Sequence, residues 1–246
     1  MVMIVGHRGA RNIWPENSLS GFRRTAALGV EAVEFDVHLS RDGTPVVIHD
    51  PTLERTAEAA GAVSARTEAE LAAIALRDGG GDGVPSLDAV LDVFGAAAIE
   101  LQIEIKTDHA GYPHAGLERA VIDMVRRKGM AGRARITSFI PAVLETTRSL
   151  WPEAPILASL DRRSAEMLGG LGPALDRFLA LDGCHIAVEK SLLASAFDVC
   201  HDRIGSDRLG AWVPNEPAEI AYWMGQPIRQ ITTDRPDIAL EVRGRK

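Results

Sequence analysis

The segment Val33-Glu34-Phe35-Asp36-Val37-His38-Leu39 predicts a β-strand with two unlike faces. Successive side chains of a strand point to opposite sides, so the apolar residues share one face and Glu34, Asp36 and His38 share the other. The segment 99–106 repeats this alternation. We expect the apolar faces to pack against helices and the polar faces to point into a barrel.

Short apolar segments alternate with segments of helical periodicity along the whole chain. The predicted strands are Met1–Val5, Ala32–Leu39, Ala98–Ile105, Ala134–Thr137, Pro155–Ser159, Cys184–Val188, Leu209–Val213 and Arg229–Thr232. The predicted helices are Ser18–Leu28, Ser86–Phe94, Gly116–Lys128, Pro141–Leu150, Leu192–His201 and Ala218–Met224. Eight strands separated by helices in 246 residues are typical of an α/β fold of the (β/α)8 TIM barrel type, although a doubly wound sheet would also alternate. We predict a TIM barrel that forms a single domain over residues 1–246.

Two features interrupt this alternation. The pair Asp42-Gly43 separates the second predicted strand from another strand-like run, which predicts an extra hairpin arm. The segment Pro51–Val84 then forms a small insertion, with a predicted helix at Glu68–Leu76 that begins with a capping box at Thr67.

The composition excludes several classes of protein. The formal charge is -7 at pH 7 and no basic cluster stands out, which argues against nucleic-acid partners and stable membrane association. No apolar run has the length of a membrane span, which is about 20 residues, and no signal peptide pattern is visible. Two cysteines fit a reducing compartment, so we predict a cytoplasmic protein. A homo-oligomer is compatible with the sequence.

Three carboxylates, Glu34, Asp36 and Glu104, are predicted to lie on the inner faces of two neighbouring strands. Their burial is costly unless positive charge compensates it. Arg and Lys neighbours could supply that charge. Because carboxylate oxygens are also the ligands that hard divalent cations prefer, we predict one bound Mg²⁺ or Ca²⁺.

Two histidines end strand-like segments, His7 after the first and His49 after the hairpin arm. Barrel enzymes keep their sites at this rim, and two imidazoles can act as acid and base on opposite sides of one phosphorus atom. Arg8 and Lys106 would supply fixed positive charge for phosphate oxygens. We assign structural or surface roles to the other histidines, His38, His109, His114, His185 and His201.

A series of motifs in one order resembles the glycerophosphodiester phosphodiesterase family over almost the whole chain. The motifs are H-R-G, P-E-N-S, E-F-D-V, D-G-T-P-V-V-I-H-D, I-E-I-K, Thr137-Ser138-Phe139, Ala211-Trp212-Val213 and Ile231-Thr232-Thr233-Asp234-Arg235-Pro236. The resemblance implies a TIM barrel with a small insertion after the H-D motif.

The resemblance also implies an activity, namely metal-dependent hydrolysis of glycerophosphodiesters, such as glycerophosphocholine or glycerophosphoethanolamine, to glycerol 3-phosphate and an alcohol. It implies His7 and His49 as the acid/base pair, and Arg8 and Lys106 on the phosphate. The implied metal ligands are Glu34, Asp36 and Glu104. Trp212 could form an apolar wall for glycerol or serve only in packing.

Two rival functions are compatible with the same residues. The first is a related barrel phosphodiesterase that acts on another anionic diester, such as a sugar-phosphate conjugate or a phospholipid. The second is a non-catalytic barrel that binds glycerophosphodiesters. An intact pair of histidines favours an enzyme, because a binding protein needs no proton transfer.

Overall fold

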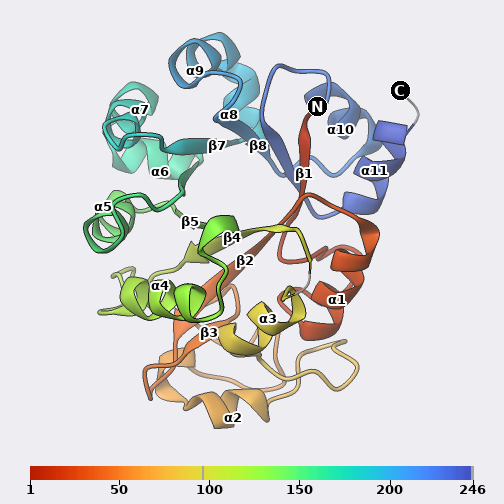
Figure 1. The fold of residues 1–246 in the computed structure, drawn as a ribbon, viewed down its shortest axis with the longest axis vertical. Coiled ribbons are helices and arrows are strands. Elements are labelled where there is room, and N and C mark those ends of the chain that lie inside the picture. The colour runs from red at the N-terminus through yellow and green to blue at the C-terminus, as the bar shows by residue number, and fades with distance from the viewer. Residues whose placement is uncertain (96, 245–246) are drawn as a thin grey trace.

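Eight parallel strands close into a barrel surrounded by helices (Figure 1). The computed structural model describes residues 1–95 and 97–244. The barrel strands are β1 (Met3–Gly6), β2 (Ala32–Leu39), β4 (Glu100–Ile105), β5 (Ala134–Ser138), β6 (Ile156–Leu160), β7 (His185–Glu189), β8 (Leu209–Trp212) and β9 (Gln230–Thr233). Because β1 pairs in parallel with both β2 and β9, the ring is closed. The predicted TIM barrel is confirmed.

The helices cover the outside of the barrel (Figure 1). They are α1 (Leu19–Leu28), α3 (Leu87–Val93), α4 (Leu117–Arg127), α5 (Pro141–Leu150), α6 (Arg162–Met167), α7 (Leu171–Leu179), α8 (Lys190–Ser195), α9 (Phe197–Ile204), α10 (Pro217–Trp223) and α11 (Pro236–Gly244). A 3₁₀ turn, η2 (Ala131–Arg133), precedes β5. The structure corrects the helix predicted at Leu192–His201, which is two helices meeting at Ala196.

The apolar face of β2 packs into the layer between barrel and helices. Phe35 is fully buried there, and the Phe22 ring of α1 lies edge-on to the rings of both Phe35 and Phe94, with centroids 5.6 Å apart in each pair. This apolar face matches the alternation predicted for the strand. The opposite face of β2 therefore points into the barrel.

Replacing Phe35 by alanine is expected to lower the free energy of unfolding by about 3–5 kcal/mol, because a large buried ring is lost and a cavity is left. Urea denaturation followed by circular dichroism measures the change. The matched control is Tyr222→Ala, which removes an aromatic ring that is 52% exposed. A loss for Phe35→Ala no larger than that of the control would contradict the packing described.

The hairpin arm and the insertion, which contains α2 (Glu68–Ala72), lie together on one side of the barrel (Figure 1). Strand β3 (Pro45–Val47) pairs antiparallel with β2, and the turn between them contains Gly43 in the left-handed region (φ 79°). This extra strand confirms the predicted arm. The helix of the insertion, α2 (Glu68–Ala72), follows a short 3₁₀ turn, η1 (Val63–Ala65), and ends four residues before its predicted end.

The insertion and the hairpin arm share a small apolar core that is separate from the main core of the barrel. Thr67 and Glu70 form the predicted capping box at the start of α2. The residues of this shared core are Val46 and Ile48 from the hairpin arm and Leu53, Ala57, Val63, Leu71, Leu76 and Val84 from the insertion. The description of the chain as one domain remains a prediction. In the part of the chain that the structure describes, no helix combines the length and apolar character needed to cross a bilayer.

Candidate active site

A cavity of about 460 Å³ opens at the carboxyl ends of the barrel strands. It is lined by residues that end or follow these strands, including His7 after β1, Lys106 after β4 and Trp212 at the end of β8. Of the eight predicted site residues, seven line it: His7, Arg8, Glu34, His49, Glu104, Lys106 and Trp212. The eighth, Asp36, is almost fully buried beside them.

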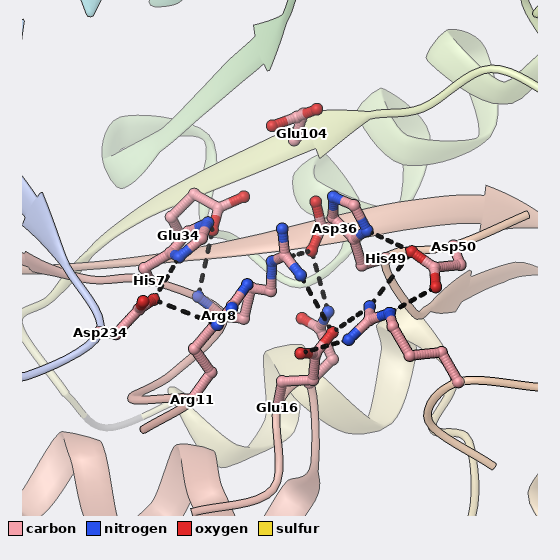
Figure 2. Close-up of polar contacts among 12 residues, drawn as sticks. His7, Arg8, Arg11, Glu16, Glu34, Asp36, His49, Asp50, Glu104 and Asp234 are labelled. Atoms are coloured by element: carbon pink, nitrogen blue, oxygen red, sulfur yellow. Dashed lines mark hydrogen bonds and ion pairs between the residues drawn. The ribbon is translucent and has the colours of Figure 1, made fainter. Parts of the chain in front are cut away.

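The three predicted carboxylates gather at one point of the barrel wall. Asp36 on β2 is in register with Glu104 on β4, and Glu34 precedes Asp36 by two residues on the same face. One oxygen from each lies within 4.8 Å of the others, and all three residues are buried. Figure 2 shows Glu34 and Asp36 on one strand, with Glu104 on the next.

The pKa values of Glu34 and Asp36 are shifted in opposite directions. Burial raises the pKa of Glu34 well above its usual value, and the neighbouring Asp36 and Glu104 raise it further. Burial also acts to raise the pKa of Asp36, but Lys106, His49 and Arg8 outweigh it and hold that pKa low. One carboxylate of the three therefore resists ionisation unless further positive charge is present.

Two buried oxygen atoms in this cluster have no hydrogen-bond partner among the described residues. They are Oε1 of Glu34 and Oδ1 of Asn17, while Nδ2 of Asn17 donates to Oδ2 of Asp36 over 2.9 Å. Unpaired buried acceptors beside a cluster of acids are costly, and hard divalent cations prefer oxygen ligands. The residues present therefore fit a bound Mg²⁺ or Ca²⁺.

Arg8 and Lys106 lie among the acids. The Nζ atom of Lys106 is 2.7 Å from Glu104 Oε1 and 3.2 Å from Asp36 Oδ1, and Arg8 Nε is 3.4 Å from Asp36 Oδ2. Burial acts to lower the pKa of Lys106, but Glu104 and Asp36 outweigh it and raise that pKa. Both the cations and the acids expected from the sequence are thus present, and they partly neutralise each other.

His7 is held by a carboxylate from the far end of the chain. Its Nδ1 lies 2.5 Å from Oδ1 of Asp234, which follows β9, and its Nε2 lies 3.8 Å from Oε2 of Glu34. Asn215 donates to the other Asp234 oxygen over 2.8 Å. Because an ionised carboxylate only accepts, the Nδ1 of His7 donates and Nε2 is left for the cavity.

His49 has the same arrangement with its own neighbour in sequence. Its Nδ1 lies 2.6 Å from Oδ1 of Asp50. Burial acts to raise the pKa of Asp50, but hydrogen bonds from Arg55 and His49 outweigh it and lower that pKa to about 2. Burial lowers the pKa of His49 itself. Nδ1 of His49 therefore donates to an ionised Asp50.

The loop after β1 takes a strained path that brings these groups together. Arg8 and Asn17 both lie in the left-handed region, with φ of 49° and 54°. The backbone N–H of Arg8 donates to Oε2 of Glu34 over 3.1 Å, so the loop is bound to the acid cluster. A Cβ at Gly6 would lie 2.2 Å from the carbonyl oxygen of Gly9, which explains a glycine before His7.

Two aromatic rings form part of the cavity wall. Trp212 and Phe139 meet edge-on with centroids 5.6 Å apart, and the indole N–H of Trp212 donates to the carbonyl of Ala187 over 3.0 Å. Both rings line the cavity. Trp212 therefore combines a packing contact with a surface that faces the cavity.

Several contacts of the site were not predicted from the sequence. Asp234 stands in the motif Thr233-Asp234-Arg235, and the sequence alone indicates no contact between it and His7. His38 and His114, assigned structural or surface roles, lie 3.2 Å apart (Nδ1 to Nε2), and Nε2 of His38 is 3.0 Å from the carbonyl oxygen of His49. The His38 side chain thus supports the backbone that carries His49.

Comparison with known proteins agrees with this arrangement. A family model described as the glycerophosphoryl diester phosphodiesterase family matches residues 7–238. The chain belongs to this family. The predicted family is confirmed, and with it the enzyme class, phosphodiesterase, at the level of the family.

Individual members of the glycerophosphoryl diester phosphodiesterase family show the extent of the similarity. A glycerophosphodiester phosphodiesterase of Caldanaerobacter subterraneus subsp. tengcongensis is 32% identical over 162 residues, which are 63% of this chain and 65% of that protein. A putative glycerophosphodiester phosphodiesterase of Bacillus subtilis is 28% identical over 97% of this chain and 96% of its own length.

Solved structures agree in fold. A putative glycerophosphoryl diester phosphodiesterase from Agrobacterium tumefaciens is 28% identical, with a TM-score of 0.90, and the match covers 100% of this chain and 98% of that one. A phosphodiesterase from Oleispira antarctica in complex with the product sn-glycerol-3-phosphate has a TM-score of 0.83 at 22% identity, with 98% and 96% of the two chains covered.

Proposed function

We propose that the protein hydrolyses glycerophosphodiesters, such as glycerophosphocholine and glycerophosphoethanolamine, to glycerol 3-phosphate and an alcohol. The observation that carries the proposal is a pair of imidazoles in one cavity, each bound through Nδ1 to a carboxylate, beside three buried acids. Family membership supports the reaction class. The product bound to the Oleispira relative supports glycerol 3-phosphate as a ligand of this cavity.

In this proposal His7 and His49 are the catalytic residues. One imidazole removes the proton from the attacking hydroxyl through its Nε2 atom, and the other donates a proton to the departing alcohol. Asp234 and Asp50 keep the Nδ1 protons in place, which fixes the tautomer that the transfer needs. Arg8 and Lys106 provide positive charge for the phosphate oxygens, and Trp212 provides a wall for glycerol.

Glu34, Asp36 and Glu104 would hold the divalent cation, Mg²⁺ or Ca²⁺. Polarisation of a phosphoryl oxygen and of the adjacent glycerol hydroxyl is the chemistry that such a cation supplies when bound. The side chain of Asn17 would orient Asp36 for this purpose through its hydrogen bond.

The attacking group in this proposal is the glycerol hydroxyl next to the phosphate. Its proton passes to one histidine as its oxygen forms a bond to phosphorus, which closes a cyclic phosphate. The bond from phosphorus to the leaving alcohol oxygen breaks, and that alcohol takes a proton from the other histidine. Water then opens the cyclic phosphate. Direct attack by water is the competing route, and a substrate analogue without that hydroxyl separates the two, since only the direct route hydrolyses it.

The test is release of glycerol 3-phosphate from glycerophosphocholine, compared with release of an alcohol from a sugar-phosphate diester and from lysophosphatidylcholine. We expect turnover of the glycerophosphodiester to be the fastest. Faster turnover of either other diester would favour the related phosphodiesterase. Binding of glycerophosphocholine with no turnover of any substrate would favour the non-catalytic barrel. Cytoplasmic location and homo-oligomerisation remain predictions.

A further inference from the structure

Arg55 extends from the insertion to two carboxylates at the edge of the cavity. Its Nε and Nη2 atoms lie 2.5 Å and 3.1 Å from the two oxygens of Asp50. Its Nη1 and Nη2 atoms lie 2.9 Å and 2.7 Å from the two oxygens of Glu16. One guanidinium therefore bridges two acids with four hydrogen bonds.

Each of these two carboxylates also accepts a hydrogen bond from a residue of the candidate site. Asp50 accepts from Nδ1 of His49 over 2.6 Å, and Glu16 accepts from Nη1 of Arg8 over 3.1 Å. Figure 2 shows Glu16 beneath Arg8 and Asp50 beside His49, joined by dashed contacts. Arg55 therefore contacts the His49 imidazole indirectly, through Asp50, and the Arg8 guanidinium indirectly, through Glu16.

The exposure of Arg55 argues against a role confined to folding. Its side chain is 46% exposed, whereas that of Glu16 is only 12% exposed. Exposed ion pairs contribute little to stability. A planar guanidinium that binds two carboxylates at both oxygens fixes their orientation, which a lysine cannot reproduce.

We propose that Arg55 is a positioning residue that aligns His49 through Asp50 and Arg8 through Glu16, so that the insertion completes the site. This inference rests on the proposed catalytic use of His49. Without Arg55, Asp50 loses two of its hydrogen bonds and can turn away from Nδ1 of His49. A misalignment of about 1 Å can cost about 100-fold in rate.

The experiment measures kcat and KM for glycerophosphocholine in Arg55→Ala, Arg55→Lys and a matched control. The control is Arg41→Ala, which removes another exposed ion pair, this one between the hairpin arm and the insertion. In it, Nη2 of Arg41 lies 3.3 Å from Oε2 of Glu70. We expect Arg55→Ala to lower kcat by about 10–100-fold and to raise KM several-fold. We expect only partial recovery in Arg55→Lys, full activity in the control, and equal melting temperatures for both alanine variants.

Double-mutant cycles separate the effect of the Arg55–Asp50 contact from that of the Arg55–Glu16 contact. In an Asp50→Asn background, Arg55→Ala should cause no further loss of kcat. In a Glu16→Gln background, it should cause no further rise in KM. Guanidinium ion added to Arg55→Ala should restore part of kcat but should not affect Arg41→Ala.

Two results would overturn the proposal. The first is an Arg55→Ala variant with wild-type kcat. The second is a loss of kcat on Arg55→Ala that is as large in the Asp50→Asn background as in the wild-type background. Failure of the proposed function looks different: the wild type would then release no glycerol 3-phosphate from glycerophosphocholine, or His49→Ala would turn it over as fast as the wild type does.

Discussion

Replacing His49 or His7 by alanine is expected to lower kcat for glycerophosphocholine by about 10²–10⁴-fold each. Each imidazole lines the cavity and is bound at Nδ1 by a carboxylate, so its Nε2 is the atom available for proton transfer. In the proposed mechanism, loss of either ring removes one of the two proton transfers. The measurement is the rate of glycerol 3-phosphate release at saturating substrate.

The matched control for this experiment is His201→Ala. That imidazole stacks on Phe197 outside the cavity, and its substitution should leave kcat unchanged. Circular dichroism should give the same spectrum for all three variants. A His49→Ala or His7→Ala variant that keeps the activity of the control would contradict the assignment of that histidine.

Removal of the divalent cation is expected to abolish glycerol 3-phosphate release, and replacing Glu34 by glutamine should prevent its restoration. The wild type should show a melting temperature that rises with Mg²⁺ or Ca²⁺, because a ligand that binds only the folded state stabilises it. Glu34→Gln should lose most of that rise, since an amide replaces one of three buried carboxylates.

Glu34→Gln should also stabilise the protein in the presence of a chelator. Burial and two neighbouring carboxylates raise the pKa of Glu34 in the folded state, so its ionisation above its usual pKa works against folding. The glutamine removes that cost. The matched control is Glu118→Gln, a buried carboxylate on α4 whose pKa is also raised by burial. Glu118→Gln should keep the cation-dependent rise in melting temperature, because Glu118 lies outside the acid cluster. A rise as large in Glu34→Gln as in Glu118→Gln would contradict the metal site.

The sequence predicts the barrel well because its strands carry a strong local pattern. In β2 every second residue from Val33 is apolar, and the period of two identifies both the strand and its inward face. Helices α6, α7 and α11 lie outside the predicted helices. Helix α6 has only six residues, too few to show a helical period, and it depends on the Asp161 side chain, which accepts from Ser164 N.

In the candidate site, too, some residues could be predicted from local sequence and others could not. Glu34, Asp36 and Glu104 could be found because they lie on adjacent strands in register. The contacts of Asp234 and Arg55 could not, because they join segments 227 and 39 residues apart, to His7 and Glu16 respectively. Such pairs carry no local period and follow only from closure of the barrel and docking of the insertion.

The most direct test of the central claim is a crystal structure of the protein with Ca²⁺ and glycerol 3-phosphate. The account predicts one cation coordinated by Glu34, Asp36 and Glu104, with the phosphate between the Nε2 atoms of His7 and His49. A cation bound elsewhere, or a phosphate that lies beyond hydrogen-bonding reach of both imidazoles, would contradict it.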